Sequence, residues 1–202
     1  MDNSALDPEL IVVQSDEGVN NDKLNEKDVF IDLLRVLKSS GLINDTIRFK
    51  KTYGGEMGYS QKINPYQEEE FTLFNIPLKE TAPYYYKLRE KAFDIDFENV
   101  ENIRAYFFID TNRSSNNRPD GIAEEWKTNN NESAKVLAEK LALEESKIYV
   151  NRGAYICYKE NYIYIFHSRS VAFYDQLKII HKNFADSIDA VIPNASKQRK
   201  DF

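Results

Sequence analysis

Residues 154–167 read AYICYKENYIYIFH, and the rest of the predicted fold is arranged around them. Two runs of β-branched and aromatic residues flank the short polar loop Lys159–Asn161. Such side chains favour the pleated, half-buried surface of a strand, and a loop of this length is typical of a β-hairpin in which Asn161 takes a left-handed conformation. The segment therefore predicts two antiparallel strands, 154–158 and 162–167.

The second strand of this hairpin presents two uncharged faces, because side chains alternate along a strand. One face consists of Ile163, Ile165 and His167 and is expected to pack on helices. The other, which we call the tyrosine face, consists of Tyr162, Tyr164 and Phe166. Exposed rows of aromatic side chains are uncommon unless something covers them. The tyrosine face is thus either covered by another helix or is a predicted binding surface, covered by a protein partner, by a second copy of the chain or by the N-terminal segment.

A long amphipathic helix is predicted directly after the hairpin. Within residues 171–192, apolar side chains recur at steps of three or four, as they do on one side of an α-helix: Phe173, Leu177, Ile180, Phe184, Ile188 and Val191. Ser168 or Ser170 can cap the first turn, and Pro193 follows the last apolar residue, where helices commonly stop.

The remaining elements follow from similar patterns. Helices are predicted over 29–40, 84–93 and 133–146, and strands over 46–53, 70–76 and 103–110. Gly41 suits the left-handed end of the helix 29–40. Val136 is expected to point inward from the helix 133–146. Residues 121–127 are predicted to form a helical turn that docks Trp126. The order α-β-β-α-β-α-β-β-α indicates an α+β fold, with a mostly antiparallel five-stranded sheet and helices packed mainly on one face.

The charge is concentrated at the N-terminus. The chain has 33 acidic and 27 basic residues; eight acidic and two basic ones fall within residues 1–28, which leaves 25 of each sign elsewhere. We therefore expect residues 1–25 to be an acidic flexible tail, 26–193 a single domain and 194–202 a polar basic tail. A neutral body argues against nucleic-acid binding, which requires clustered lysine and arginine side chains.

The sequence also indicates the compartment. Cys157 is the single cysteine, so an internal disulfide is excluded, and it is expected to be a small buried apolar residue. The chain shows neither a signal-peptide pattern nor a run of 18 apolar residues. These features predict a cytoplasmic protein without a membrane segment.

One constellation suggests chemistry. Asp110 ends the most apolar predicted strand and leads into a polar loop with Arg113 and Arg118, while His167 ends the second hairpin strand. A carboxylate at a strand end can bind Mg²⁺, and arginine can hold a phosphate. The competing interpretation is that Asp110 makes a turn with the next two residues and that the arginines are solvated.

The function predicted from these observations is protein–protein contact by a non-catalytic binding or regulatory protein, with a protein partner or self-association. The binding residues proposed for it are Tyr162, Tyr164, Phe166, Asp110, Arg113 and His167. The alternative is a small metal-dependent or phosphate-acting enzyme with a site near Asp110 and His167. Because the two histidines and one cysteine lack metal-ligand spacing and no cofactor motif is present, we expect neither a bound metal nor a cofactor.

Overall fold

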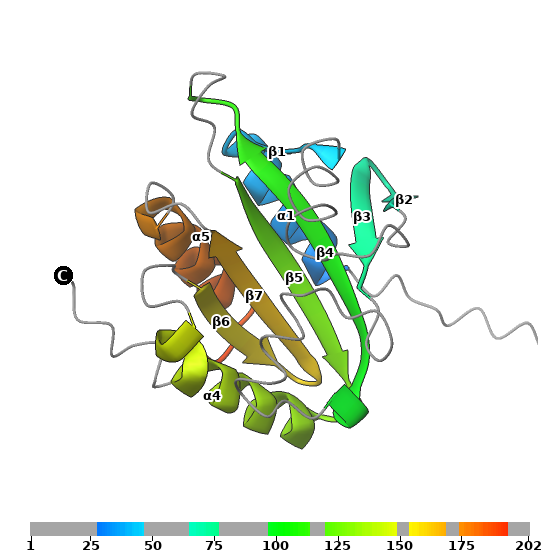
Figure 1. Ribbon diagram of the computed structural model, residues 1–202, viewed down its shortest axis with the longest axis vertical. Coiled ribbons are helices and arrows are strands. Elements are labelled where there is room, and N and C mark those ends of the chain that lie inside the picture. Colours follow the sequence, from blue (N-terminus) through cyan, green and yellow to red (C-terminus); the bar gives the residue numbers. More distant parts are fainter. Residues whose placement is uncertain are drawn as a thin grey trace, which may run out of the picture.

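Seven strands form one antiparallel sheet in the part of the chain that the structure describes. The computed structural model describes residues 28–46, 65–76, 97–113, 120–148, 154–168 and 174–193. The strands are β1 (Leu42–Asn44), β2 (Pro65–Glu68), β3 (Phe71–Asn75), β4 (Val100–Asp110), β5 (Asp120–Thr128), β6 (Ala154–Lys159) and β7 (Tyr162–Ser168). Their order is β2-β3-β4-β5-β7-β6, and β1 pairs with the last residues of β4 on the edge that β3 also uses (Figure 1).

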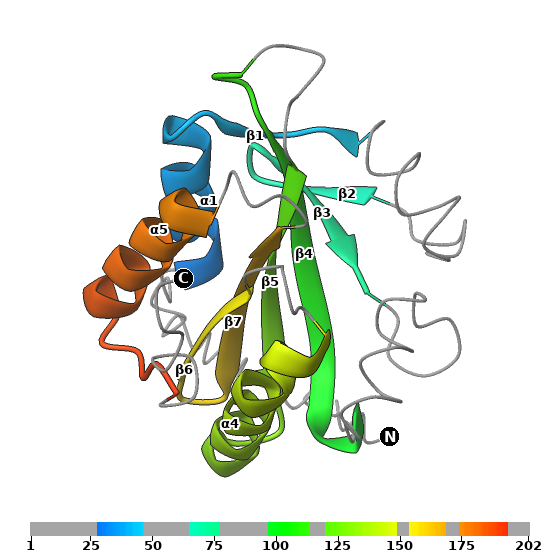
Figure 2. The ribbon, with the colours of Figure 1, turned by 60° about the vertical axis from the view of Figure 1, so that its left-hand side comes forward.

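Helices cover both faces of the sheet. Helix α1 (Val29–Ser39) and helix α5 (Tyr174–Ser187) lie on one face, and helix α4 (Asn131–Ile148) lies on the other (Figure 2). A 3-10 helix, η2 (Phe97–Asn99), leads into β4. None of the helices in the described ranges is both long and apolar enough to span a bilayer.

Each face of the sheet carries its own hydrophobic core, because alternate residues of every strand point to opposite sides. The core under α4 contains Ile163, Ile165 and the fully buried Trp126. The core under α1 and α5 contains Tyr164, Phe166 and the buried helical residue Leu177. The two central strands, β4 and β5, are therefore largely buried on both sides, which explains the apolar run 105–109 in β4.

Several predicted elements are confirmed. The hairpin, the final helix, the helix after residue 130 and the strand ending at Asp110 are all present, and Gly41 ends α1 with a φ of +80°. The hairpin turn is tighter than predicted: Lys159 pairs with Tyr162, and Glu160 rather than Asn161 has the positive φ, at +51°. The α+β class and the antiparallel sheet are also confirmed.

The predicted number of strands was wrong. The sheet has seven described strands rather than five: four of the predicted strands are present, and β1, β2 and β5 are additional, since residues 121–127 form most of β5 rather than a helical turn. The predicted element order is therefore also not matched, because β4 and β5 follow each other without a helix between them. The adjacent acids Glu124 and Glu125 hid this strand, since a strand buried on both faces is expected to be apolar. Both carboxylates are accommodated inside the fold: Glu124 accepts a hydrogen bond from Trp126 Nε1 at 2.7 Å, and Glu125 pairs with Arg104.

Other predicted segments lie outside the described residues. These are the tails 1–25 and 194–202, the helix 84–93 and all but the first residue of the strand 46–53. Within the described residues, Asn44 bridges the point where β1 and β3 meet beside β4. Its amide nitrogen donates to the carbonyl oxygens of Thr72 and Phe107, at 3.1 and 3.0 Å.

Candidate functional site

The Asp110 turn supports the end of helix α1. The Asp110 carboxylate is 3% exposed and accepts hydrogen bonds from the backbone N–H of Asn112 at 2.9 Å and from Arg113 Nε at 3.2 Å. The Thr111 N–H and hydroxyl both donate to the carbonyl oxygen of Gly41, at 3.0 and 2.8 Å. These contacts are those of a side-chain-stabilised turn that satisfies carbonyl groups at a helix C-terminus.

The residues of the suggested catalytic constellation are only partly brought together. Asp110 and Arg113 form an ion pair across the turn. The backbone of His167 pairs with Ile122 of β5 and with Ala154 of β6, so the whole of β5 lies between it and β4, which ends at Asp110. Arg118 lies outside the described residues. The turn therefore has a structural explanation that needs no ligand.

Replacing Asp110 tests this structural role. Asp110→Ala should lower the free energy of unfolding by about 1–2 kcal/mol, because the partly buried hydrogen bond from the Asn112 N–H and the contact with Arg113 are lost. Asp110→Asn keeps an oxygen acceptor and should cost less than about 1 kcal/mol. Urea denaturation of both variants measures the difference, and equal losses would show that the acceptor at this position does not stabilise the turn.

Two of the three residues of the tyrosine face are buried in the protein's own core. Tyr164 is 3% exposed and Phe166 is fully buried, and the rings of both pack edge-on against Phe184 of α5, with centroid distances of 5.0 and 5.8 Å. Tyr162 is only partly buried and packs against the same core. The prediction of an exposed aromatic face was wrong because it placed the helices on one side of the sheet, whereas α1 and α5 cover this side and α4 covers the other.

A buried charge cluster lies at the start of α1. The guanidinium group of Arg104, in β4, contacts three carboxylates: Asp28 at 2.8 Å, Glu68 at 2.8 Å and Glu125 at 2.6 Å. It also lies over the ring of Phe30, 5.2 Å from the centroid. Asp28 additionally caps α1, because its side chain accepts the N–H groups of residues 30 and 31. Arg104 thus joins α1, β2, β4 and β5.

The electrostatics of this cluster follow from three carboxylates sharing one cation. Burial raises the pKa of Glu125 to about 7, against the opposing effect of Arg104, and Asp28 and Glu68 act in the same direction as burial. Burial alone would raise the pKa of Asp28, but hydrogen bonds from Arg104 and the backbone hold that pKa below its ordinary value. This cluster could not be predicted from the sequence, since its members are far apart in the chain and meet only in the folded protein.

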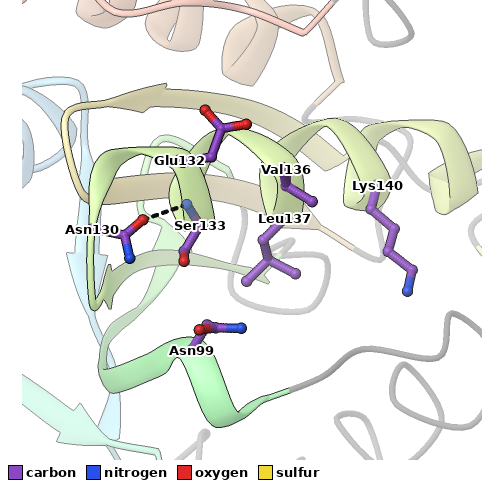
Figure 3. A pocket seen from close by; sticks show the side chains of 7 residues that line it. All are labelled: Asn99, Asn130, Glu132, Ser133, Val136, Leu137 and Lys140. Atoms are coloured by element: carbon purple, nitrogen blue, oxygen red, sulfur yellow. Dashed lines mark hydrogen bonds between the residues drawn. The ribbon is translucent and has the colours of Figure 1, made fainter.

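The α4 groove is an open concave surface among the described residues. It has a volume of about 520 Å³ and is lined by Asn99, Asn130, Glu132, Ser133, Val136, Leu137 and Lys140. Leu137 and Lys140 extend from α4 toward the side on which Asn99 of η2 lies (Figure 3). Val136, which the sequence placed inward, is 54% exposed, whereas Leu137 is buried.

Hydrogen bonds hold the two segments that line the groove. The Asn130 side chain caps α4 by accepting the N–H of Ser133 at 2.9 Å (Figure 3). The N–H of Asn129 donates to the carbonyl oxygen of Asn99 at 3.0 Å, which ties the start of α4 to η2. The buried Thr128 hydroxyl contacts the carbonyl oxygens of Asn130 and Asn161, each at 2.9 Å. Backbone and side-chain bonds therefore fix both walls of the groove relative to the sheet.

The lining of the groove is mostly polar. It offers one exposed aliphatic side chain, two amides, one hydroxyl and charges of both signs at Glu132 and Lys140. In the described part of the chain, no three His, Cys, Asp or Glu side chains are placed to hold a metal ion. Comparison with protein-family models, with curated proteins and with solved structures finds no match to this chain.

Proposed function

We propose that this chain is a non-catalytic binding protein that acts through contact with another protein, and that the α4 groove is its contact surface. The observation that carries the proposal is the groove itself: an open concavity of about 520 Å³ with exposed Val136 above buried Leu137 and a polar rim. An apolar centre surrounded by polar side chains is the usual arrangement of a protein interface.

The rigidity of α4 supports the same function. Its inner side packs on the sheet through buried residues, namely Ala134, Leu137, Ala138, Leu141 and Ala142. The cap at Asn130 and the tie between Asn129 and Asn99 hold its first turn. A preformed groove binds without first ordering its own backbone, which reduces the entropy lost on association.

The amide and hydroxyl groups favour a peptide segment as the bound element. Asn99 and Asn130 each offer both a donor and an acceptor, so they can pair with the N–H and C=O groups of an extended chain. Glu132 and Lys140 are eight positions apart on α4, about 12 Å along the helix, which corresponds to about four residues of extended chain. A partner segment with a basic and an acidic residue at about this spacing would match the charges along the groove.

A matched pair of variants tests the groove. Val136 and Ile179 are both exposed aliphatic residues on helices, 54% and 60% exposed, so an added carboxylate at either position leaves the cores intact. The partner is captured by photo-crosslinking from position 136 in the source cells, purified, and titrated calorimetrically. Val136→Asp should raise the Kd by at least about tenfold, whereas Ile179→Asp should leave it unchanged. Equal effects of the two variants would exclude the groove as the contact surface.

A further inference from the structure

The outer edge of the sheet is closed by the C-terminal part of the described chain. Strand β6 is the last strand, and its outer side pairs with residue 191, where Tyr158 N–H donates to Val191 O at 2.9 Å and Val191 N–H donates to Tyr158 O at 2.8 Å. Lys159 Nζ contacts the carbonyl oxygen of Ile188. An uncovered edge strand is a template for pairing with another chain, so this closure protects the sheet.

His181 of α5 belongs to the same closure. Its imidazole interacts with the backbone of Ile156, the residue two positions before Tyr158 in β6, and this interaction favours the charged ring. The ring lies between Tyr155 and Phe166, with centroid distances of 5.7 and 5.6 Å. The β6 edge is thus held by a histidine side chain at one position and by a backbone bridge at another. We call α5 with residues 188–193 the C-terminal latch.

The Nε2 atom of the buried His181 makes no hydrogen bond to the described part of the chain while the ring is neutral. His181 is 4% exposed, and its Nε2 has no hydrogen-bond partner among the described residues. In neutral imidazole one nitrogen is an acceptor, so an unused Nε2 lone pair is tolerated at moderate cost. Protonation converts Nε2 to a donor on a charged ring with no acceptor near it, and such a group is stable only in contact with water.

The groups that surround His181 do little to stabilise its charged imidazole. Strand β6 brings Tyr155 and Cys157 and strand β7 brings Tyr164; burial raises the pKa values of the last two, so both stay neutral in acid. Helix α1 faces this core with apolar residues. On α5 itself, Asp186 favours the charged imidazole, but burial outweighs it and lowers the pKa of His181 to about 4.

We infer that the C-terminal latch is an acid-released closure of the β6 edge, and that His181 is the group whose protonation opens it. When the ring takes up a proton it must reach water, which separates α5 from Tyr155 and Phe166 and moves the imidazole away from the backbone of Ile156. The Val191 bridge follows, because residue 191 is joined to α5 by a short connection. The released β6 then presents unpaired N–H and C=O groups to solvent.

Hydrogen exchange at the bridge measures the release. The reporters are the amides of Tyr158 and Val191, and the reference is the set of amides in β4 and β5. With an ordinary pKa of about 6.5 in the open form, protection of the reporters, corrected for intrinsic exchange, should fall about 70-fold between pH 7.5 and pH 4.5. Protection of the reference amides should change by less than about tenfold, because the carboxyl of Glu125 titrates in the opposite sense when the whole domain unfolds.

Two variants and one spectroscopic measurement decide the outcome. His181→Asn keeps a donor near Ile156 and His181→Phe keeps the ring contacts, and neither titrates, so both should lose the pH dependence at Tyr158 and Val191. Independently of how well the variants fold, nitrogen chemical shifts of His181 in the unaltered protein should show titration only as the reporters lose protection. A 70-fold loss that persists in either variant, or titration of His181 near pH 6.5 with the reporters fully protected, would overturn the inference.

Discussion

Replacing Arg104 by methionine should lower the free energy of unfolding by about 3–5 kcal/mol at pH 7.5. The change leaves the carboxylates of Asp28, Glu68 and Glu125 together without their cation, and Glu125 is only 5% exposed. Removing one partner of a buried ion pair is strongly destabilising, because the remaining charge stays buried. Methionine retains much of the aliphatic volume, so the loss reports on charge and hydrogen bonds more than on packing.

Arg35 is the matched control for this experiment. It also contacts three carboxylates, Asp32, Glu69 and Glu70, but its side chain is 47% exposed, compared with 15% for Arg104. Water screens exposed ion pairs, so Arg35→Met should cost less than about 1 kcal/mol. Urea denaturation of the two variants compares an exposed guanidinium group with a largely buried one that contacts the buried carboxylate of Glu125. Equal losses would mean that burial does not determine the effect of the Arg104 cluster.

A double variant tests whether the destabilisation by Arg104→Met comes from the uncompensated charge of Glu125. Arg104→Met combined with Glu125→Gln removes the most buried of the orphaned charges, so it should be more stable than Arg104→Met alone. Residues in one ion-pair network are coupled, and the departure from additivity measures that coupling. If the second change only adds to the first loss, the destabilisation of Arg104→Met does not come from the uncompensated carboxylate of Glu125.

The parts of the fold that the sequence predicted are those set by local pattern. Alternation in residues 154–167 and the three-to-four spacing of apolar residues after residue 171 depend only on neighbouring positions, and both elements are present. The helix nevertheless ends at Ser187 rather than near residue 192, because Val191 pairs with Tyr158 of β6. Gly41 is similar, because a left-handed helix end is a property of one residue. Local pattern also hid β5, since Glu124 and Glu125 are acceptable in a buried strand only through partners that tertiary structure supplies.

The functional surfaces could not be predicted for a related reason. The tyrosine face is aromatic whether a partner or the chain's own helix covers it, and only the three-dimensional arrangement shows that α5 does. The α4 groove forms between residue 99 and residues 130–140, two segments that the sequence does not connect. Asp110 was correctly placed at a strand end, but its low exposure depends on the turn that it makes against Gly41.

Glu125 and His181 should contribute to the free energy of unfolding with opposite dependence on pH. The folded protein binds a proton at Glu125 more tightly than the unfolded chain does, since the pKa of this carboxyl is about 7 in place of 4.5. Its contribution to stability is present below pH 4.5 and is lost as the pH rises through 7. His181 has the reverse sign: with a folded pKa of about 4, its contribution is present above pH 6.5 and is lost as the pH falls toward 4.

Each term corresponds to about 3 kcal/mol, from a pKa difference of about 2.5 units at 1.36 kcal/mol per unit. The two nearly cancel between pH 7.5 and pH 4.5, so the free energy of unfolding of the unaltered protein should change by less than about 1 kcal/mol over this range. Glu125→Gln removes one term, and its stability should fall by about 2–3 kcal/mol on acidification. His181→Asn removes the other, and its stability should rise by a similar amount.

Urea denaturation at several pH values between 4.5 and 7.5 measures all three curves. The difference between the unaltered protein and Glu125→Gln isolates the carboxyl, because every other titrating group is common to both. A flat difference curve would show that Glu125 titrates in the folded protein as it does in the unfolded chain, and that Arg104 fully compensates its burial. A difference in the free energy of unfolding that grows as the pH falls would instead confirm that the single guanidinium group of Arg104 does not neutralise all three carboxylates. Glu125 would then be the carboxylate that takes up the proton.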